Sequence, residues 1–239
     1  MSSIHAQALA VRFFIDRSKR LVTPGQARLR RGISTVYGLK DVTFAAEGGE
    51  AIALVGLSGS GKTTLLRALA GVYEPDDGEL VVRGRVGSLL SIEAGLLWSL
   101  TGRENAQLLA VLAGVKRRRA GAAVEQIKER TALADAFERP VASFSQGMRA
   151  RLGFAVAEYL EPNVLLLDEV HEALDHEFRR YIADRAREIV ERGGIVVAAG
   201  HDHDMLGTFC TRALWLSGGR VQSDGPFEGV RREYLSEAA

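Results

Sequence analysis

The chain has 239 residues, of which 46% are hydrophobic, so it can bury the core of one domain with at most a small second lobe. It carries 31 Lys and Arg against 30 Asp and Glu, and this near-neutral balance gives no electrostatic reason to expect nucleic acid as a partner. It has no run of 18 apolar residues and no signal-peptide pattern, and its single cysteine, Cys210, excludes an internal disulfide. These features predict a soluble or peripheral protein of a reducing compartment, in which any membrane role depends on another chain.

A polar, basic segment interrupts the N-terminal region, which otherwise has strand character. Residues 15–34 include Pro24 and Gly25 and have no helix or strand period, which predicts a long loop or insertion. The segment holds one of two basic clusters, around residues 28–31, and the other cluster is residues 116–119. Such clusters are usually solvated faces. Contact with anionic lipid headgroups is the functional alternative, which the clusters alone do not establish.

Short aliphatic runs alternate with longer helical stretches, which is typical of a parallel α/β sheet. Residues 51–55, 164–167 and 195–199 are almost wholly apolar, as expected of strands buried on both faces. Residues 101–160 have mainly helical character: Thr101 and Glu104 have the spacing of a capped helix start, and residues 121–137 and 147–160 are rich in alanine. We therefore expect a single domain over residues 1–239, with a core lobe of residues 1–90 and 161–239 and an inserted helical lobe of about residues 91–160.

A glycine-rich loop follows the predicted strand 51–55 and precedes a helical stretch, residues 64–70. It satisfies the pattern G-x-x-x-x-G-K-[ST], in which glycines let backbone N–H groups wrap a phosphate and the helix start adds its dipole. Lys62 would supply a positive charge to the phosphates, and Thr63 would supply a hydroxyl to Mg²⁺. The alternative is a flexible turn, which does not explain the Lys-Thr pair. The residues predicted to bind ATP are Gly56, Ser58, Gly59, Ser60, Gly61, Lys62, Thr63 and Thr64.

Acidic and histidine residues follow two further predicted strands. Asp168 and Glu169 come directly after the strand 164–167, at the edge where open parallel sheets bind ligands. Asp168 is the expected Mg²⁺ ligand, directly or through water, and Glu169 is expected to position and polarise the attacking water. His201 follows the strand 195–199 and is predicted to hydrogen-bond a γ-phosphate, a role we prefer for it over His203. The alternatives are an ordinary acidic strand end and a structural histidine.

Residues 144–149 read Phe-Ser-Gln-Gly-Met-Arg and precede a helical stretch, residues 150–160. Ser145 and the N–H groups of Gln146 and Gly147 would present a helix start to an anion, although a plain capped helix has the same pattern. With the glycine-rich loop, the acid pair and the histidine in this order, the chain resembles the ABC ATPase family. The resemblance implies an α/β P-loop cassette with an N-terminal antiparallel β region, a mostly parallel sheet and an inserted helical subdomain. It also implies a homodimer in which residues 145–147 of one copy face the ATP of the other.

Three stretches resemble, more narrowly, the ATPase subunits of exporters of O-antigen, capsule, teichoic acid or galactan chains. They are residues 145–157, residues 87–114 and the insertion before Tyr37. The resemblance implies an ATPase that uses ATP and Mg²⁺ at the cytoplasmic face of the inner membrane, together with separate integral membrane permease subunits. Because little sequence follows Tyr234, we expect a short form without the C-terminal carbohydrate-binding domain of some relatives. An exporter of lipids or drugs, and a soluble ABC ATPase outside transport, are the alternatives.

The chain departs from the family pattern at the loop that enters the helical lobe. A glutamine is usual there, whereas this chain has Ser91 and Glu93, and Glu93 is the candidate metal ligand. Residues 96–98 follow and offer apolar surface for a permease helix, or pack internally. The resemblance further implies an aromatic ring that stacks on adenine near the N-terminus, and the candidates are Tyr37, which we favour, Phe13 and Phe14.

Overall fold

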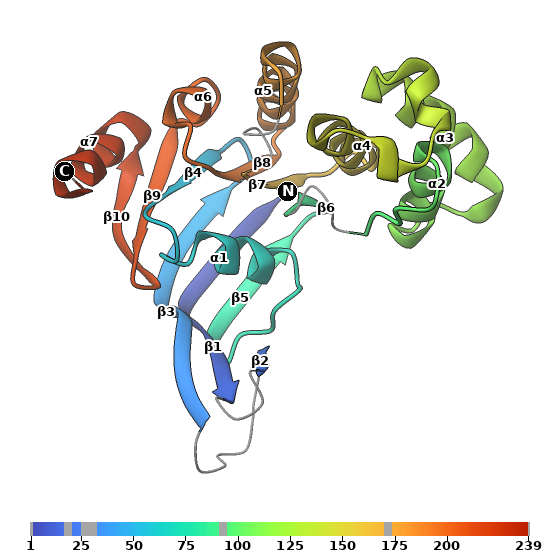
Figure 1. Cartoon of the computed structure of the whole chain (residues 1–239). Coiled ribbons are helices and arrows are strands. Elements are labelled where there is room, and N and C mark those ends of the chain that lie inside the picture. Colours follow the sequence, from blue (N-terminus) through green and yellow to red (C-terminus); the bar gives the residue numbers. More distant parts are fainter. Residues whose placement is uncertain (1, 17–20, 25–32, 91–94, 170–173, 239) are drawn as a thin grey trace.

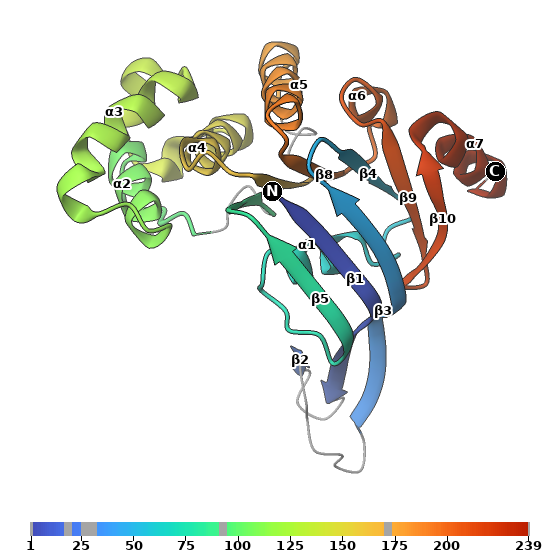
Figure 2. The same ribbon diagram turned by 180° about the vertical axis from the view of Figure 1, so that it is seen from behind.

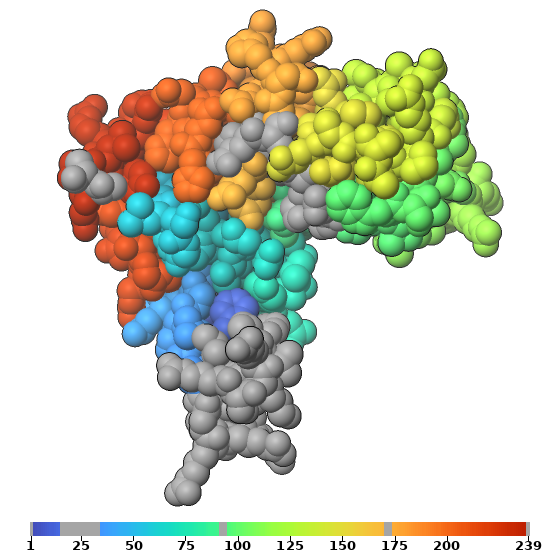
Figure 3. All heavy atoms as spheres, viewed as in Figure 1, coloured from blue at the N-terminus to red at the C-terminus, as the bar shows by residue number. Residues whose placement is uncertain are grey.

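The structure is a computed structural model of the whole chain, and it describes residues 2–16, 21–24, 33–90, 95–169 and 174–238. Figure 1 shows two sheets, with the helices α5, α6 and α7 along one of them. The helices α2, α3 and α4 form a group at one end of the molecule. In the space-filling view this group, coloured green to yellow, extends sideways from the core (Figure 3). The strands are β1 (Ser3–Asp16), β2 (Leu21–Pro24), β3 (Ile33–Glu47), β4 (Ala51–Val55), β5 (Asp77–Arg83), β6 (Val86–Leu89), β7 (Val164–Asp168), β8 (Ile195–Ala199), β9 (Arg212–Ser217) and β10 (Arg220–Pro226). The helices are α1 (Lys62–Leu69), α2 (Gly102–Leu112), α3 (Ala120–Thr131), α4 (Gln146–Tyr159), α5 (His176–Glu191), α6 (His203–Gly207) and α7 (Phe227–Ala238), with 3₁₀ turns η1 (Arg117–Arg119), η2 (Ala134–Glu138) and η3 (Val141–Ser143).

The larger sheet has six strands in the order β10-β9-β4-β8-β7-β6, and its pairs are parallel except for β10 with β9. Every residue of β4, β7 and β8 is buried, because both faces of this sheet are covered. These three strands are the ones predicted from the aliphatic runs, and they lie side by side at the centre of the sheet. The prediction of an α/β fold with a mostly parallel sheet is confirmed.

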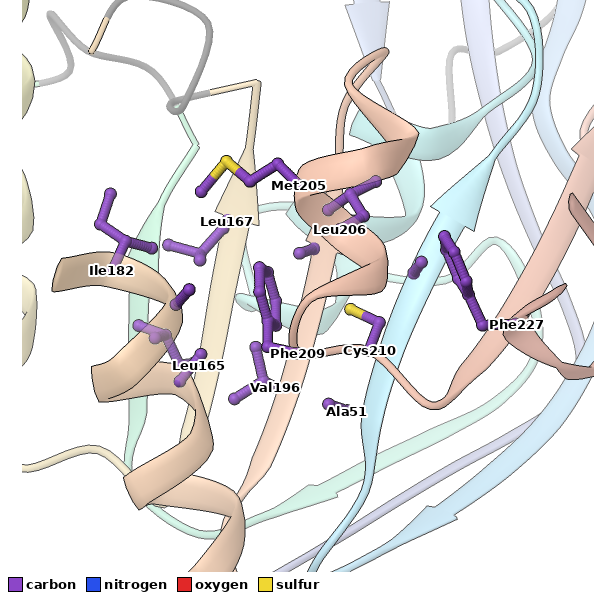
Figure 4. Packing of buried hydrophobic residues seen from close by; sticks show 14 of the residues in the cluster. Ala51, Leu165, Leu167, Ile182, Val196, Met205, Leu206, Phe209, Cys210 and Phe227 are labelled. Carbon is purple, nitrogen blue, oxygen red and sulfur yellow. The ribbon is translucent and has the colours of Figure 1, made fainter. Parts of the chain in front are cut away.

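Two apolar layers cover the faces of the larger sheet, and successive side chains of a strand alternate between them. In β4, Ala53 belongs to the layer formed with α5, α6 and α7, whereas Ile52 and Leu54 belong to the layer shared with α1 and the smaller sheet. Figure 4 shows part of the first layer, in which Leu167 of β7 lies between the sheet and Ile182 of α5. This packing on both faces holds the ends of the central strands in fixed positions.

The smaller sheet is antiparallel, with the order β2-β1-β3 and with β5 also paired to β1, as predicted for the N-terminal region (Figure 2). The loop predicted over residues 15–34 is wrong in part, because β1 continues to Asp16, β2 occupies residues 21–24 and β3 begins at Ile33. Main-chain hydrogen bonds between strands form such pairs even where the side chains have no clear period. The remaining residues, 17–20 and 25–32, lie outside the described residues.

The helices α2, α3 and α4 pack around an apolar cluster of their own, which includes Ile127, Phe137 and Leu152. The start of α2 is the predicted capping box. The hydroxyl of Thr101 accepts a hydrogen bond from the N–H of Glu104, and the Glu104 carboxylate accepts one from the N–H of Thr101 at 2.8 Å.

The helix predicted over residues 121–137 is wrong over its last six residues, 132–137. The helix α3 ends at Thr131 because Ala132 and Ala134 adopt positive φ values of 52° and 47°, which a right-handed helix excludes. The 3₁₀ turn η2 follows the break. No helix within the described part of the chain combines the length and the apolar character that crossing a bilayer requires.

Candidate functional site

The glycine-rich loop, the acid pair and His201 each follow a central strand, and the carboxyl ends of these strands, β4, β7 and β8, meet at one edge of the sheet. A hollow of about 190 Å³ lies at this edge. Its lining residues are Gly38, Ser58, Gly59, Gly61, Lys62, Thr63, Thr64 and Glu169. The fold therefore brings most of the predicted loop together with one of the two acids.

Three glycines shape the loop, because each adopts a positive φ: 144° at Gly56, 80° at Gly59 and 112° at Gly61. A Cβ atom on Gly56 would lie 2.2 Å from the carbonyl oxygen of Leu216, and one on Gly61 would lie 2.7 Å from that of Gly38. At Gly59 the space is open, so only the backbone conformation favours glycine. Gly61 precedes α1 and supplies no side-chain cap, which leaves the first N–H groups of this helix facing the loop.

Lys62 is the first residue of α1, and only 5% of it is exposed. Its Nζ donates hydrogen bonds to the carbonyl oxygens of Gly56 at 2.7 Å and Leu57 at 3.1 Å, so the ammonium group is held within the loop. Ser60 is also buried, and its Oγ has no hydrogen-bond partner among the described residues. The loop thus contains a fixed positive charge and an unsatisfied hydroxyl, both of which an anion would stabilise.

Asp168 is the last residue of β7, and the hydroxyl of Thr63 lies near its carboxylate. Burial raises the pKa of Asp168, an effect that the Thr63 hydroxyl opposes and the nearby charge of Glu169 reinforces. Oδ1 of Asp168 is buried without a hydrogen-bond partner in the described part of the chain. A hydroxyl beside an unsatisfied carboxylate oxygen forms a pair of hard oxygen ligands, so Thr63 and Asp168 fit Mg²⁺.

Larger clusters of metal-binding side chains are absent from the described residues, where no group of three or more His, Cys, Asp or Glu is placed to hold an ion. Mg²⁺ usually needs no such cage, because it keeps several waters and shares its other positions with substrate phosphates.

Glu169 adopts a left-handed conformation with φ of 52°, and its N–H donates to the carbonyl of Ala199 at 2.9 Å. Strained residues of this kind cluster at functional sites. Oε1 of Glu169 lies 3.4 Å from Nε2 of His201, and about half of each side chain is exposed. The acid and the histidine predicted to take part in hydrolysis are therefore neighbours across the ends of β7 and β8.

His203, the competing histidine, lies in α6 and has different surroundings. Its ring contacts Tyr234 of α7 edge-on, with the ring centroids 5.4 Å apart. Burial lowers its pKa. Among the described residues it forms no ion pair with Glu169, so the geometry favours His201 for a role at the sheet edge.

Ser145 precedes α4, and its hydroxyl accepts a hydrogen bond from the N–H of Met148 at 3.2 Å. Gln146 and Gly147 are the first two residues of this helix, and Ser145 and Gln146 are exposed. None of the three lines the hollow, and Figures 1 and 2 show α4 with the helical group, apart from α1. Within one chain, the two predicted phosphate-binding helix starts are therefore separate.

Tyr37 is 43% exposed and precedes Gly38, which lines the hollow. Nζ of Lys40 lies 5.4 Å from the centre of its ring. The other two aromatic candidates are less accessible: Phe13 packs edge-on against Tyr73 with ring centroids 5.4 Å apart, and Phe14 is partly buried in β1. Tyr37 is therefore the most accessible of the three rings. The remaining candidates, Ser91 and Glu93, lie outside the described residues.

Gly38 is a site residue that the sequence reasoning missed. A Cβ atom at this position would lie 2.5 Å from a ring carbon of Phe13 and 2.9 Å from Cγ2 of Thr64. A larger residue here would have to push aside the ring of Phe13 and the methyl group of Thr64, so glycine favours this close approach of β3 to the start of α1. A glycine inside a strand often marks such an approach, and that signal was present in the sequence.

Comparison with known proteins gives consistent results. A family model described as ABC transporter matches residues 39–172. The teichoic acids export ATP-binding protein TagH of Listeria monocytogenes is 31% identical over 219 residues, which are 92% of this chain and 64% of that protein. The O-antigen export system ATP-binding protein RfbB of Klebsiella pneumoniae is 35% identical over 201 residues, which are 84% of this chain and 82% of that protein. The chain thus spans less than two thirds of the length of TagH.

Solved structures share the fold. A dimeric, post-hydrolysis state of the ATP-binding cassette MJ0796 bound to ADP and Pi has a TM-score of 0.76 at 20% identity, and the match covers 94% of this chain and 98% of that one. An ATP binding subunit of an ABC transporter has a TM-score of 0.75 at 23% identity, covering 99% and 95%. These matches confirm the predicted cassette fold. Because the family model spans more than half of the sequence and RfbB matches over most of both chains, this chain belongs to the ABC transporter family.

Proposed function

We propose that this protein is the ATP-hydrolysing, nucleotide-binding subunit of an ABC exporter that moves a polysaccharide or lipid-linked glycan across the cytoplasmic membrane. The observation that carries the proposal is the meeting of Lys62, the Thr63–Asp168 pair and Glu169 at one edge of the sheet. The cargo class is supported by the relatives, since TagH and RfbB are described as export proteins for teichoic acids and O-antigen.

The glycine-rich loop would bind the phosphates of ATP through its N–H groups, the start of α1 and the ammonium group of Lys62. On binding, the phosphate oxygens would replace the carbonyls of Gly56 and Leu57 as partners of Lys62. Thr63 and Asp168 would hold Mg²⁺, which when bound offsets the charge of the terminal phosphates. Tyr37 would stack on adenine, as its exposed ring beside Gly38 suggests.

Glu169 would orient the attacking water and accept its proton, and its carboxylate is accessible because about half of the side chain is exposed. His201, with its Nε2 3.4 Å from that carboxylate, would hold Glu169 in place and donate a hydrogen bond to the γ-phosphate. The chemistry therefore rests on positioning and on electrostatic stabilisation of phosphate charge.

A homodimer would complete the site. Ser145, Gln146 and Gly147 form an exposed helix start that lines no part of the hollow in its own chain, so they would serve the nucleotide of a second copy. Two-fold symmetry would then create two equal sites, each with the loop of one copy and the helix start of the other. The solved MJ0796 cassette is described as dimeric, which supports this arrangement at the level of the fold.

The domain would divide at residues 90 and 160 into the core lobe and the helical lobe expected from the sequence. The separate apolar cluster of α2, α3 and α4 supports this division. Between the lobes lies a hollow of about 470 Å³, lined among others by Leu89 of β6, Leu109 of α2 and Val156 of α4. Two apolar side chains on its lining are well exposed, with 72% of Leu112 and 61% of Val72 accessible.

This apolar hollow would receive a cytoplasmic helix of an integral membrane permease subunit, a separate chain, and so hold the protein at the cytoplasmic face of the inner membrane. Leu97 and Trp98 are also exposed, at 49% and 46%, whereas Leu96 is buried. Of the three residues predicted to offer permease surface, the last two therefore remain available, although the guanidinium of Arg149 lies 4.9 Å from the ring of Trp98.

The test is the variant Glu169→Gln. We expect hydrolysis to fall at least 100-fold, the usual range for a lost general base, while ATP binding persists and a dimer accumulates. Phosphate release measures hydrolysis, calorimetry measures ATP binding, and light scattering with ATP measures the dimer. Glu177→Gln, a change of one exposed carboxylate at the start of α5, is the matched control and should behave as the parent chain. Parental turnover in Glu169→Gln would remove Glu169 from the proposed role.

A further inference from the structure

One group of charges in the helical lobe takes no part in the proposed function. About half of the arginines in the described residues contact a carboxylate; Arg103, for example, pairs with Glu125 at 2.5 Å and with Glu138 at 2.8 Å. By contrast, four successive cations between α2 and α3 are all exposed, and within the described residues their side chains have no ion pair or hydrogen bond. We name this group the basic turn: Lys116, Arg117, Arg118 and Arg119.

The backbone of the basic turn spreads its charges outward. The last three residues form the 3₁₀ turn η1, and Lys116 precedes it in an extended conformation with ψ of 130°. Because a 3₁₀ turn has three residues per turn, successive side chains point about 120° apart. The turn lies within the green to yellow-green end of the molecule in Figure 3, which extends away from the core. The cations therefore form a broad patch rather than a pocket for one small anion.

Apolar side chains lie just before the basic turn, on the last residues of α2. Leu112 is 72% exposed and Val111 is 37% exposed. Leu112 and Ala113 also line the hollow between the lobes, and the basic turn begins three residues after Ala113. The cations and the rim of this hollow are therefore close along the chain.

We infer that the basic turn binds the anionic phospholipid headgroups of the leaflet next to which the protein works, with Leu112 entering the headgroup layer. Cations beside exposed aliphatic side chains are typical of segments that lie in a membrane interface. The guanidinium groups suit phosphate, which they bind in a bidentate manner. None of the four side chains is held by a partner in the described structure, which suits a fluid layer of phosphates better than a protein surface of fixed geometry.

The orientation of this patch toward a membrane rests on the proposed function, because the adjoining hollow is the proposed permease site. The binding of headgroups does not, since it depends only on the charges and the apolar side chains. Each cation close to an anionic leaflet should strengthen association about fivefold, and salt should weaken it because the Debye length is only about 8 Å at physiological ionic strength.

The experiment measures co-sedimentation of the full chain, without nucleotide, with vesicles of phosphatidylglycerol and phosphatidylcholine in equal parts or of phosphatidylcholine alone. The parent chain should bind the anionic vesicles at least about tenfold more tightly, and high salt should abolish the difference. The test variant combines Lys116→Gln, Arg117→Gln, Arg118→Gln and Arg119→Gln, and should lose about tenfold or more of this affinity.

The matched control removes the same charge from dispersed, exposed positions, and should bind within about twofold of the parent chain. It combines Arg83→Gln, Arg139→Gln, Arg180→Gln and Arg232→Gln. Equal losses in both variants would show that only net charge matters, and would overturn the inference.

A second measurement follows Leu112 directly. Cys210 is buried, so a fluorophore that senses polarity can be attached selectively to the variant Leu112→Cys. Its emission should shift to the blue with anionic vesicles, and the shift should disappear when the basic turn is neutralised. An unchanged spectrum would overturn the inference. So would a basic turn that binds a purified permease but no vesicle, because the patch would then be a protein interface.

The two proposals fail separately. The vesicle measurements contain no nucleotide, so a chain that does not hydrolyse ATP can still support the lipid inference. Conversely, parental ATP hydrolysis with no preference for anionic vesicles would leave the proposed function intact and remove the lipid inference.

Discussion

The starts of α1 and α4 are both expected to meet a phosphate group, yet they are built differently. The helix α1 follows Gly61, which has φ of 112° and supplies no side-chain cap, and the buried Lys62 comes next. The helix α4 follows Ser145, an extended residue with ψ of 164°, whose hydroxyl caps the N–H of Met148. The first start lines the hollow beside Glu169, whereas the second is exposed and lines no part of it.

Under the proposed function, the start of α1 would belong to a half-site that is complete within one chain, whereas the start of α4 would depend on a second surface. At α1, the charges that would hold a phosphate and its cation come from one chain. At α4 only a helix dipole and a hydroxyl are offered, and these act once an anion is brought to them. Binding of ATP should therefore be a property of the isolated chain, whereas hydrolysis should require both starts.

The largest effect on stability is expected at the C-terminal end of α4, where ion pairs of Glu158 hold the helix in place. Glu158 is 3% exposed, lies 2.5 Å from Arg185 and accepts a hydrogen bond from the hydroxyl of Tyr181 at 2.6 Å, with Arg130 of α3 at 3.7 Å. Removal of Glu158 leaves Arg130 without its carboxylate partner and Arg185 with Glu188 alone, so Glu158→Ala should lower the free energy of unfolding by about 3 kcal/mol. Chemical denaturation of the chain without nucleotide measures the loss.

The control for this prediction is Tyr181→Phe, which removes one hydrogen bond and should cost about 1 kcal/mol. By comparison, α1 is anchored by Leu65 and Leu66, neither of which is exposed. Equal costs for the two variants would mean that α4 is also held mainly by apolar packing, and this contrast with α1 would disappear.

The next largest effect concerns the self-contained half-site. Lys62→Ala should weaken ATP binding by the isolated chain about 100-fold, because hydrogen bonds to a charged group are lost and no other cation among the described residues lines the hollow. Calorimetry measures the affinity. Lys128→Ala is the control, since that ammonium pairs with Glu138 at 2.8 Å on the surface and should not affect binding. Parental affinity in Lys62→Ala would contradict the assignment of the loop.

Ser145→Ala tests the half-site that depends on a second surface. Loss of the cap should destabilise the chain by about 1 kcal/mol and leave ATP affinity unchanged, while hydrolysis falls roughly tenfold. Thr101→Ala provides a matched control, because Thr101 caps α2 with the same backbone angles, φ of −66° and ψ of 164°. The control should lose similar stability and keep its hydrolysis rate. If both variants lose hydrolysis equally, Ser145 acts through the stability of the lobe alone.

The smallest effect is a pH dependence at Asp168. Burial raises the pKa of Asp168, so the folded chain binds this proton more tightly than the unfolded chain. Stability should therefore fall as the pH rises from the ordinary aspartate value, about 4, through the raised one. In the chain without nucleotide, Asp168→Asn should remove this fall and raise the melting temperature near neutral pH by roughly 2 °C. Thermal melts across pH measure the effect, and a lower melting temperature in the variant would contradict it.

Much of the candidate site could be predicted because its residues follow recognisable local patterns. The glycines and Lys62 lie in one short motif after an apolar strand, and Asp168 with Glu169 ends another such strand. Other features carried no local signal. The break at Ala132 occurs without glycine or proline, and the pairing of β2 with β1 lies in a segment without a clear period. Pairing and packing between segments that are distant in the sequence decide such features, and one-dimensional patterns do not record them.

The sequence by itself determined the chemistry of the loop, since positive φ values and a buried ammonium group need particular residues at particular places. It also determined that three strands would be buried on both faces. Only the tertiary structure decided that β8 lies between β4 and β7, which brings His201 within 3.4 Å of Glu169. It alone placed Gly38 against the start of α1 and left Ser145 away from the hollow of its own chain. The reason is that strand order and contacts between distant segments depend on how whole elements pack, whereas motifs constrain only their immediate neighbours.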